Sequence, residues 1–256
     1  TTVGLQALIL AVAEGKEIIV PRNAHRSVLG GLVLAGADPV YVRPETIPEF
    51  GLDCGVPPSR IGSLLEEHPG AAAVLSVCPN YYGVSGDLAG QVLAAQGADR
   101  PLLVDEAHGP HLRFHRDLPS DAMAAGADAS VQSTHKLGGS LTQTSLLHLG
   151  GGRVDAGRVA AALSLLQTTS PSYILMASLD LARRQLAEKG EELLGRALDL
   201  ARGARRRLSG VRGLRVLDKE HLPPGPFDLD STKLVISVRD LGLTGYQAAA
   251  LLAGRY

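Results

Sequence analysis

The sequence has few cysteines, no excess of charge of either sign and no long hydrophobic run. Its two cysteines, Cys54 and Cys78, form no CxxC pair, so we expect no disulfide framework and a reducing, cytoplasmic compartment. The 25 Lys and Arg residues nearly balance the 26 Asp and Glu residues, so neither a nucleic acid nor an anionic membrane is the expected partner. The longest apolar stretches, Leu5–Ala13 and Ala71–Val77, are too short to span a bilayer. A small molecule is therefore the default partner.

The ends of the sequence suggest a piece of a longer chain. It opens on Thr1 without an initiator Met, and it stops at Tyr256, just after the apolar segment Tyr246–Leu252 that has helical spacing. We expect residues 1–210 to form a large domain that lacks its N-terminal part. Residues 211–256 are then the start of a truncated, smaller α+β domain, because proline becomes frequent there and a new strand follows.

Short apolar runs alternate with segments of helical spacing along the first 150 residues. This alternation predicts an α/β fold with three layers, in which helices cover both faces of a mostly parallel sheet. Between Arg153 and Leu208 the spacing predicts two or three long helices with a break near Ser170-Pro171. The predicted strands are Ile18–Val20, Val40–Val42, Ala71–Val77, Pro101–Val104 and Ala127–Gln132.

Polar side chains follow three of these strands. Asp105 comes directly after Pro101–Val104, and Lys136 lies beyond Ala127–Gln132, 31 residues further on. His25 lies on the loop after the first strand. Ligands of open α/β sheets bind beyond the carboxyl ends of the strands, so these side chains are placed for chemistry.

Two motifs invite a different interpretation. Asp105-Glu106-Ala107-His108 spells the acidic box of some helicases, but the sequence has no GxxxxGK[ST] loop to hold nucleotide phosphates. Ser133-Thr134-His135-Lys136 matches the SxxK of serine β-lactamases, but the companion motifs are absent.

A metal site is a third alternative, because histidine is a common zinc ligand. His108, His111 and His115 lie close together in the sequence, but after a strand their spacing fixes no common face. We therefore expect no metal, and we expect local hydrogen bonds within the loop for His111 and His115.

These residues meet the chemical needs of a pyridoxal-phosphate (PLP) enzyme. Such an enzyme uses a lysine for the Schiff base, a carboxylate for the pyridine nitrogen, a flat group against the ring and an anion site for the phosphate. Lys136, Asp105 and His25 are candidates for the first three. A helix that opens at Thr1, Thr2 and Gly4 offers free N–H groups to a phosphate, and Ser133 and His135 flank the lysine.

The sequence resembles the major domain of the Orn/Lys/Arg decarboxylase family, a fold-type-I PLP group, from Thr2 to about Asp180. The similar segments are long and occur in the same order. They read TTVGLQALILA, VPRNAHRSVLGGLVLAGADPVYV, PNYYGVSGDL, LLVDEAHGPHLRFHRDLP, GADASVQSTHKLGGSLTQTSLLH and LQTTSPSYILMASLD.

The resemblance implies a role for each candidate. Lys136 binds the cofactor covalently, Asp105 pairs with the pyridinium nitrogen, and His25 and Ala107 lie on opposite faces of the ring. His108 lies near the ring hydroxyl or the substrate carboxylate. The residues that hold the phosphate are Ser133, His135, Thr1 and Thr2. The resemblance also implies a homodimer or an assembly of dimers, in which the segment with Thr168, Thr169 and Ser170 reaches the neighbouring subunit's cofactor.

The expected reaction is decarboxylation of lysine, ornithine or arginine to a diamine or agmatine. The alternatives are another fold-type-I reaction, such as that of an aminotransferase or lyase, and a truncated protein that binds PLP without turnover. Two positions depart from the family pattern. Asn80 stands where the family more often has Thr, and Gly138-Gly139 loosens the turn after Lys136.

Overall fold

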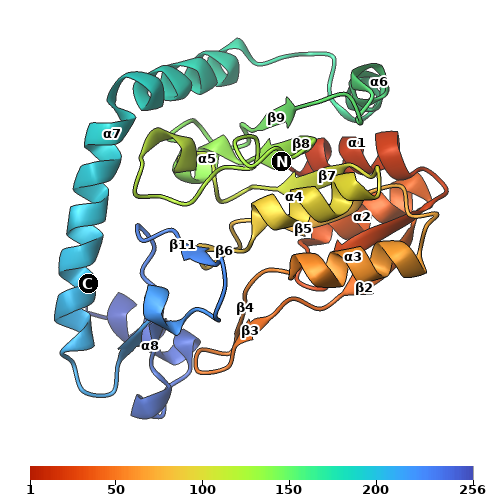
Figure 1. Ribbon diagram of the computed structural model, residues 1–256. Coiled ribbons are helices and arrows are strands. Elements are labelled where there is room, and N and C mark those ends of the chain that lie inside the picture. Colours follow the sequence, from red (N-terminus) through yellow and green to blue (C-terminus); the bar gives the residue numbers. More distant parts are fainter. Residues whose placement is uncertain (256) are drawn as a thin grey trace.

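A six-stranded sheet forms the centre of the computed structural model, which describes residues 1–255 (Figure 1). The strand order is β2-β1-β5-β7-β8-β9. All neighbouring strands from β2 to β8 are parallel, and only β9 runs antiparallel. The predicted mostly parallel sheet is therefore confirmed. Its strands are β1 (Glu17–Pro21), β2 (Asp38–Val42), β5 (Val74–Val77), β7 (Leu102–Asp105), β8 (Ala129–Gln132) and β9 (Leu146–Leu149).

Helices bury both faces of this sheet. Successive strand side chains point to opposite faces, so Ile18 and Val20 belong to one apolar core and Ile19 belongs to the other. The first core includes residues of α1 (Thr2–Ala13), α2 (Arg26–Ala35) and α6 (Ala156–Leu166). The second includes residues of α3 (Pro58–Glu67) and α4 (Leu88–Gly97). Burial on both faces explains why the strands read as unbroken apolar runs.

Local sequence signals begin and end the flanking helices. Asp87 accepts a hydrogen bond from the Gly90 N–H and so caps α4. Pro58 occupies the first turn of α3. Gly36 ends α2 in the left-handed conformation, with φ of 56°.

Three local features were not predicted from the sequence. Thr1 is the N-cap of α1, without a side-chain cap hydrogen bond. Residues 43–58 contain the short hairpin β3 (Thr46–Ile47) and β4 (Leu52–Asp53). Lys136 lies on the one-turn helix α5 (Thr134–Leu137) directly after β8.

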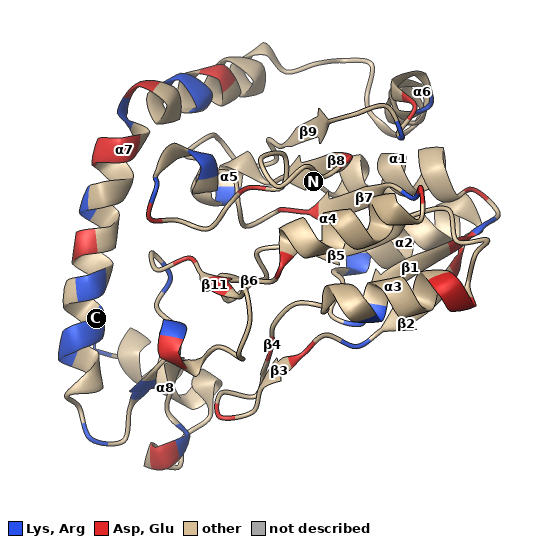
Figure 2. Cartoon of the chain, viewed as in Figure 1, with Lys and Arg blue, Asp and Glu red and all other residues tan. Residues whose placement is uncertain are grey.

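The long helix α7 (Tyr173–Ser209) connects the sheet to the C-terminal part of the chain (Figure 1). The predicted break near Pro171 is confirmed, because α6 ends at Leu166 and α7 begins at Tyr173. Charges of both signs alternate along α7 (Figure 2), as expected for a helix with a solvated face. No helix within residues 1–255 is long and apolar enough to cross a membrane.

Residues 210–255, called the C-terminal segment below, have little regular structure. The strand β11 (Asp228–Leu229) pairs antiparallel with β6 (Val84–Ser85), which lies after β5 of the large sheet. The new strand expected in this segment is only two residues long, β12 (Ile236–Ser237), and it pairs with β10 (Arg215–Val216). The division into domains 1–210 and 211–256 stays a prediction. The remaining elements are η1 (Leu112–Phe114), β10 (Arg215–Val216), η2 (Lys219–His221), β11 (Asp228–Leu229), β12 (Ile236–Ser237), η3 (Arg239–Leu241) and α8 (Gly245–Ala253).

Candidate active site

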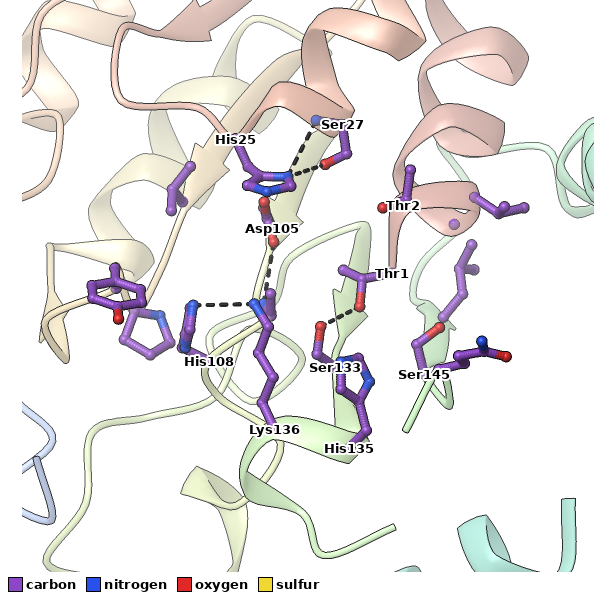
Figure 3. A pocket seen from close by; sticks show the side chains of 18 of the residues that line it. Thr1, Thr2, His25, Ser27, Asp105, His108, Ser133, His135, Lys136 and Ser145 are labelled. Atoms are coloured by element: carbon purple, nitrogen blue, oxygen red, sulfur yellow. Dashed lines mark hydrogen bonds between the residues drawn. The ribbon is translucent and has the colours of Figure 1, made fainter. Parts of the chain in front are cut away.

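A cavity of about 770 Å³ lies at the carboxyl edge of the sheet. The ends of β1, β7 and β8 meet there because parallel strands present their carboxyl ends at one edge (Figure 3). Nine of the eleven predicted site residues line the cavity. They are Thr1, Thr2, His25, Asp105, Ala107, His108, Ser133, His135 and Lys136.

Asp105 is a buried acid at the centre of this edge. It is the last residue of β7, next to Val77 of β5 and Val131 of β8, and its exposed fraction is 4%. Burial raises the pKa of Asp105, although the Ala107 N–H at 3.2 Å and the nearby Lys136 act in the opposite direction. A carboxylate in this position is stabilised by a cation placed against it.

Lys136 and His108 face each other inside the cavity (Figure 3). Lys136 Nζ lies 3.2 Å from His108 Nε2, although 28 residues separate them in the chain. The other imidazole nitrogen, Nδ1, lies 3.3 Å from the Nζ of Lys233 in the C-terminal segment. Burial and the two lysines lower the pKa of His108 to about 4. The imidazole is therefore neutral at physiological pH.

The N-terminus of α1 and the end of β8 form a polar corner of the cavity. The Thr1 hydroxyl bonds to the Ser133 hydroxyl instead of capping the helix. Gly4 allows this close approach, since a Cβ there would lie 2.9 Å from Val131 Cγ1 of β8. The first-turn N–H groups of a helix have no acceptor within that helix. Together with the two hydroxyls, these groups offer donors to an anion.

His25 and His135 are oriented by neighbouring groups. His25 Nδ1 accepts a hydrogen bond from the Ser27 N–H at 3.2 Å, and Figure 3 shows the ring beside Asp105. His135 Nδ1 lies 2.7 Å from the Thr144 carbonyl oxygen, which fixes the ring next to Ser133. Both rings are therefore held at the cavity by hydrogen bonds to neighbouring backbone groups.

Thr168 and Thr169 do not line this cavity. They are exposed on the connection between α6 and α7, where the Thr168 hydroxyl accepts a hydrogen bond from the Ser170 N–H at 3.2 Å. Ser170 itself is also exposed. Their expected role at a neighbouring subunit stays a prediction.

The expectation of local hydrogen bonds was wrong for His111 and right for His115. His111 does not bond within its loop, because its Nε2 lies 3.0 Å from Oδ2 of Asp230, 119 residues further on, and both side chains are buried. His115 does make a local bond, with Nδ1 accepting from the Asp117 N–H at 3.1 Å. Among residues 1–255, no group of three or more His, Cys, Asp or Glu side chains is arranged to hold a metal ion.

Sequence reasoning missed two residues next to the cavity. Tyr81 lines the cavity, and its ring meets the His108 ring edge to face at 5.3 Å between centroids. Lys233 contacts both His108 and the Tyr81 carbonyl oxygen. Tyr81 could have been found, because the Asn-Tyr-Tyr-Gly loop directly follows β5 and therefore lies at the carboxyl edge of the sheet. No local pattern indicated Lys233, since it reaches the site from the C-terminal segment.

The fold and this edge of the sheet define the large domain of a fold-type-I PLP-dependent enzyme. The lysine decarboxylase A of Pseudomonas aeruginosa, a solved structure, has a TM-score of 0.71 and 25% identity, covering 82% of this chain and 31% of that one. The family model of the Orn/Lys/Arg decarboxylase major domain matches residues 1–235. The chain therefore belongs to this family.

Curated relatives agree with that membership. An arginine decarboxylase of Halalkalibacterium halodurans is 44% identical over 258 residues, which is 100% of this chain and 52% of the relative. An arginine decarboxylase of Bacillus subtilis is 44% identical over 248 residues, or 96% of this chain and 51% of the relative. The chain spans about half the length of the curated relatives it matches.

Proposed function

We propose that this chain carries the active site of a PLP-dependent decarboxylase that converts a basic amino acid into an amine and carbon dioxide. Arginine, lysine and ornithine are the candidate substrates, with agmatine or a diamine as product. The observation that carries the proposal is the cavity that Lys136 and Asp105 share, beside a corner of hydroxyl and N–H donors. The names of the relatives support the substrate class.

The residues present fit the cofactor. Lys136 extends its amine into the cavity, and Asp105 is a buried acid whose raised pKa calls for a cation, such as a protonated ring nitrogen. His25 and Ala107 line the cavity next to Asp105, where a flat ring would lie between them. Donors at one end suit a phosphate, and these come from Thr1, Thr2, Ser133 and His135.

Bound PLP supplies an aromatic ring that accepts the electron pair left on Cα when carbon dioxide departs. The chain contributes charge, position and protons. Asp105 keeps a negative charge where the ring nitrogen needs a counterion. Lys136 Nζ and His108 Nε2, 3.2 Å apart, form a pair that can deliver a proton to the Cα left without its carboxylate. His108 is neutral at physiological pH, so it forms this pair with Lys136 without placing a second cation there.

We also propose that two copies of the chain form a homodimer with shared active sites. The start of α7 exposes several large apolar side chains, with Tyr173 78%, Ile174 74% and Met176 57% exposed. An exposed apolar patch of this kind is typical of an interaction surface. The patch follows directly after Thr168 and Thr169, which are themselves exposed. A cytoplasmic location is a further proposal, consistent with two buried free thiols.

A carbon-dioxide release assay tests the function. The full-length protein is incubated with PLP and carboxyl-labelled arginine, lysine or ornithine, and one of these should release labelled carbon dioxide. Lys136→Ala should lower the rate by at least about 1,000-fold, as expected when a covalent catalytic group is removed. Lys189→Ala on the exposed surface of α7 is the matched control and should keep the parent rate.

Three results would contradict the proposal in distinct ways. Formation of a keto acid without carbon dioxide would indicate an aminotransferase. PLP binding with no turnover of any of the three amino acids would indicate a non-catalytic protein. A Lys136→Ala variant that retains a borohydride-reducible link to PLP would show that another lysine binds the cofactor.

A further inference from the structure

Lys233 occupies a position next to the active site that the proposed mechanism leaves unused. Its Nζ lies 3.3 Å from His108 Nδ1 and donates to the Tyr81 carbonyl oxygen at 2.8 Å. The same nitrogen lies 5.6 Å from the centre of the Tyr81 ring, within the range of a cation–π contact. A lysine held by three contacts, one with His108 and two with Tyr81, is fixed in place, unlike a lysine on an open surface.

The backbone around Lys233 is closely fitted to the loop after β5. The Asp230 N–H donates to the Gly83 carbonyl oxygen at 2.8 Å, which extends the β11–β6 pairing up to the lysine. Gly83 has φ of 89°, and a Cβ there would lie 3.0 Å from Lys233 Cδ. Only glycine adopts this conformation readily, so the loop leaves room for the lysine side chain.

Two lysines on opposite sides of one imidazole restrict its protonation. A neutral imidazole has one N–H donor and one acceptor nitrogen, so two ammonium groups cannot both donate to His108. In the proposed function Lys136 binds the cofactor covalently and is then no longer an ammonium group, whereas Lys233 stays free and also donates to the Tyr81 carbonyl oxygen. With the cofactor bound, Lys233 therefore donates to Nδ1 and the Nε2–H faces Lys136.

We propose that Lys233 is a positioning residue whose ammonium binds His108 Nδ1 and fixes the tautomer that carries its proton on Nε2, facing Lys136. The inference deepens the proposed decarboxylase function and rests on it. Lys233 touches neither the substrate nor the cofactor in this scheme. It sets the atom of His108 from which a proton can pass into the cavity, and its charge disfavours an imidazolium.

The charges that face His108 agree with this role. After burial, the largest cause of the lowered pKa of His108 is Lys233, followed by Lys136 and His25, whereas Asp230 acts in the opposite direction. Replacing Lys233 with a neutral residue removes a lowering influence, so the pKa of His108 should rise. The acid limb of the rate profile should then move to higher pH.

Nitrogen NMR of PLP-loaded, full-length protein without substrate, labelled with [15Nδ1]-histidine, tests the proposal without turnover. The signal of His108 is identified by its loss in His108→Gln. In the parent protein Nδ1 should be unprotonated at pH 7 and still largely unprotonated at pH 5.5, because burial and Lys233 lower the pKa of His108. Lys233→Met should raise the protonated fraction at pH 5.5 at least about fivefold.

Two further variants separate charge from folding. Lys233→Gln keeps a hydrogen-bond donor but loses the charge, so it should show the same direction of change and serves if Lys233→Met unfolds. Lys219→Met, an exposed lysine of the same segment that pairs with Asp228, should behave like the parent protein. A parent protein with Nδ1 protonated at pH 7, or neutral variants with the parent titration, would overturn the proposal. Because no substrate is present, a failed decarboxylation assay would leave this result intact.

Discussion

The carboxyl edge of the sheet and the C-terminal segment reach the same cavity by different physical routes. At the sheet edge, strand register places Asp105 beside Val77 and Val131, so backbone hydrogen bonds fix the position of the acid. The C-terminal segment is attached by the two-residue strand β11, by a few polar side chains and by a small apolar cluster in which Leu217 and Leu229 pack with Ile47, Phe50 and Val84. The difference indicates that Asp105 is positioned by the register of the large sheet, whereas Lys233 is positioned by side-chain contacts outside that sheet.

Breaking the buried contact between the two regions should have the largest effect. His111→Leu leaves the Asp230 carboxylate, which is fully buried, without its imidazole partner. Loss of one member of a buried pair costs about 3–5 kcal/mol. Urea unfolding of the full-length protein at pH 7 measures this cost. His68→Leu, which removes a half-buried histidine paired with the exposed Glu17 side chain, should cost less than about 1 kcal/mol.

The pH dependence of this cost has a definite sign. Burial alone would raise the pKa of Asp230, but the hydrogen bonds from His111 and Thr232 hold it below its ordinary value. A carboxyl group with a depressed folded-state pKa stabilises the fold above its unfolded pKa of about 3.9 and loses that contribution as the pH falls through the lower value. The difference between the parent protein and His111→Leu should therefore shrink below about pH 4. Equal losses in His111→Leu and His68→Leu would contradict the role of the pair.

A second substitution tests the sheet edge and should leave the fold intact. Asp105→Asn keeps the size of the side chain and removes its charge. Decarboxylation should fall about 100- to 1,000-fold, the range for removal of one preorganised electrostatic group. The free energy of unfolding should not decrease by more than about 1 kcal/mol, because burial already disfavours the charged form of Asp105.

Asp128 provides the matched control for Asp105. It is 1% exposed and lies at the opposite end of the same strands, where it accepts a hydrogen bond from the Leu102 N–H at 2.9 Å. Asp128→Asn should lower stability by about 1–3 kcal/mol and leave the reaction rate unchanged. If Asp105→Asn instead lost stability and kept its rate, Asp105 would be a structural acid.

The sheet edge was largely predictable from the sequence, for a physical reason. Each strand is a short apolar run in the sequence. The polar residues that follow it lie at the carboxyl edge of the sheet, because the strands are parallel. This rule was enough to bring Asp105 and Lys136 to one cavity. The roles given to His25, Ser133 and His135 came from the family resemblance and stay predictions, and the structure places all three residues at the cavity.

The contacts of the C-terminal segment could not be predicted in this way. His111 and Asp230 meet across 119 residues, and His108 and Lys233 meet across 125, without a periodic pattern around either pair. A strand of two residues such as β11 is too short to produce a hydrophobic alternation. Long-range polar contacts of single side chains are set by the packed structure, so sequence spacing carries no signal for Lys233.

The smallest expected effect concerns the attachment of the C-terminal segment to α7. The buried guanidinium of Arg205 donates to the carbonyl oxygens of Leu217, Ser231 and Lys233 at 3.2, 3.3 and 2.8 Å. Arg205→Lys keeps the charge but loses the planar fork that reaches three acceptors. We expect a local loss of about 1–2 kcal/mol, measured by hydrogen–deuterium exchange that becomes about 5- to 30-fold faster in residues 215–235.

Exchange in β1, β5, β7 and β8 should stay at the parent rate in Arg205→Lys, because those strands are held by the sheet rather than by this side chain. Arg206→Lys, at an exposed neighbouring position, is the matched control and should change neither region. Faster exchange throughout the sheet would mean that the two regions unfold as one unit. In that case Lys233 would be positioned as cooperatively as Asp105, and the contrast between the two regions would disappear.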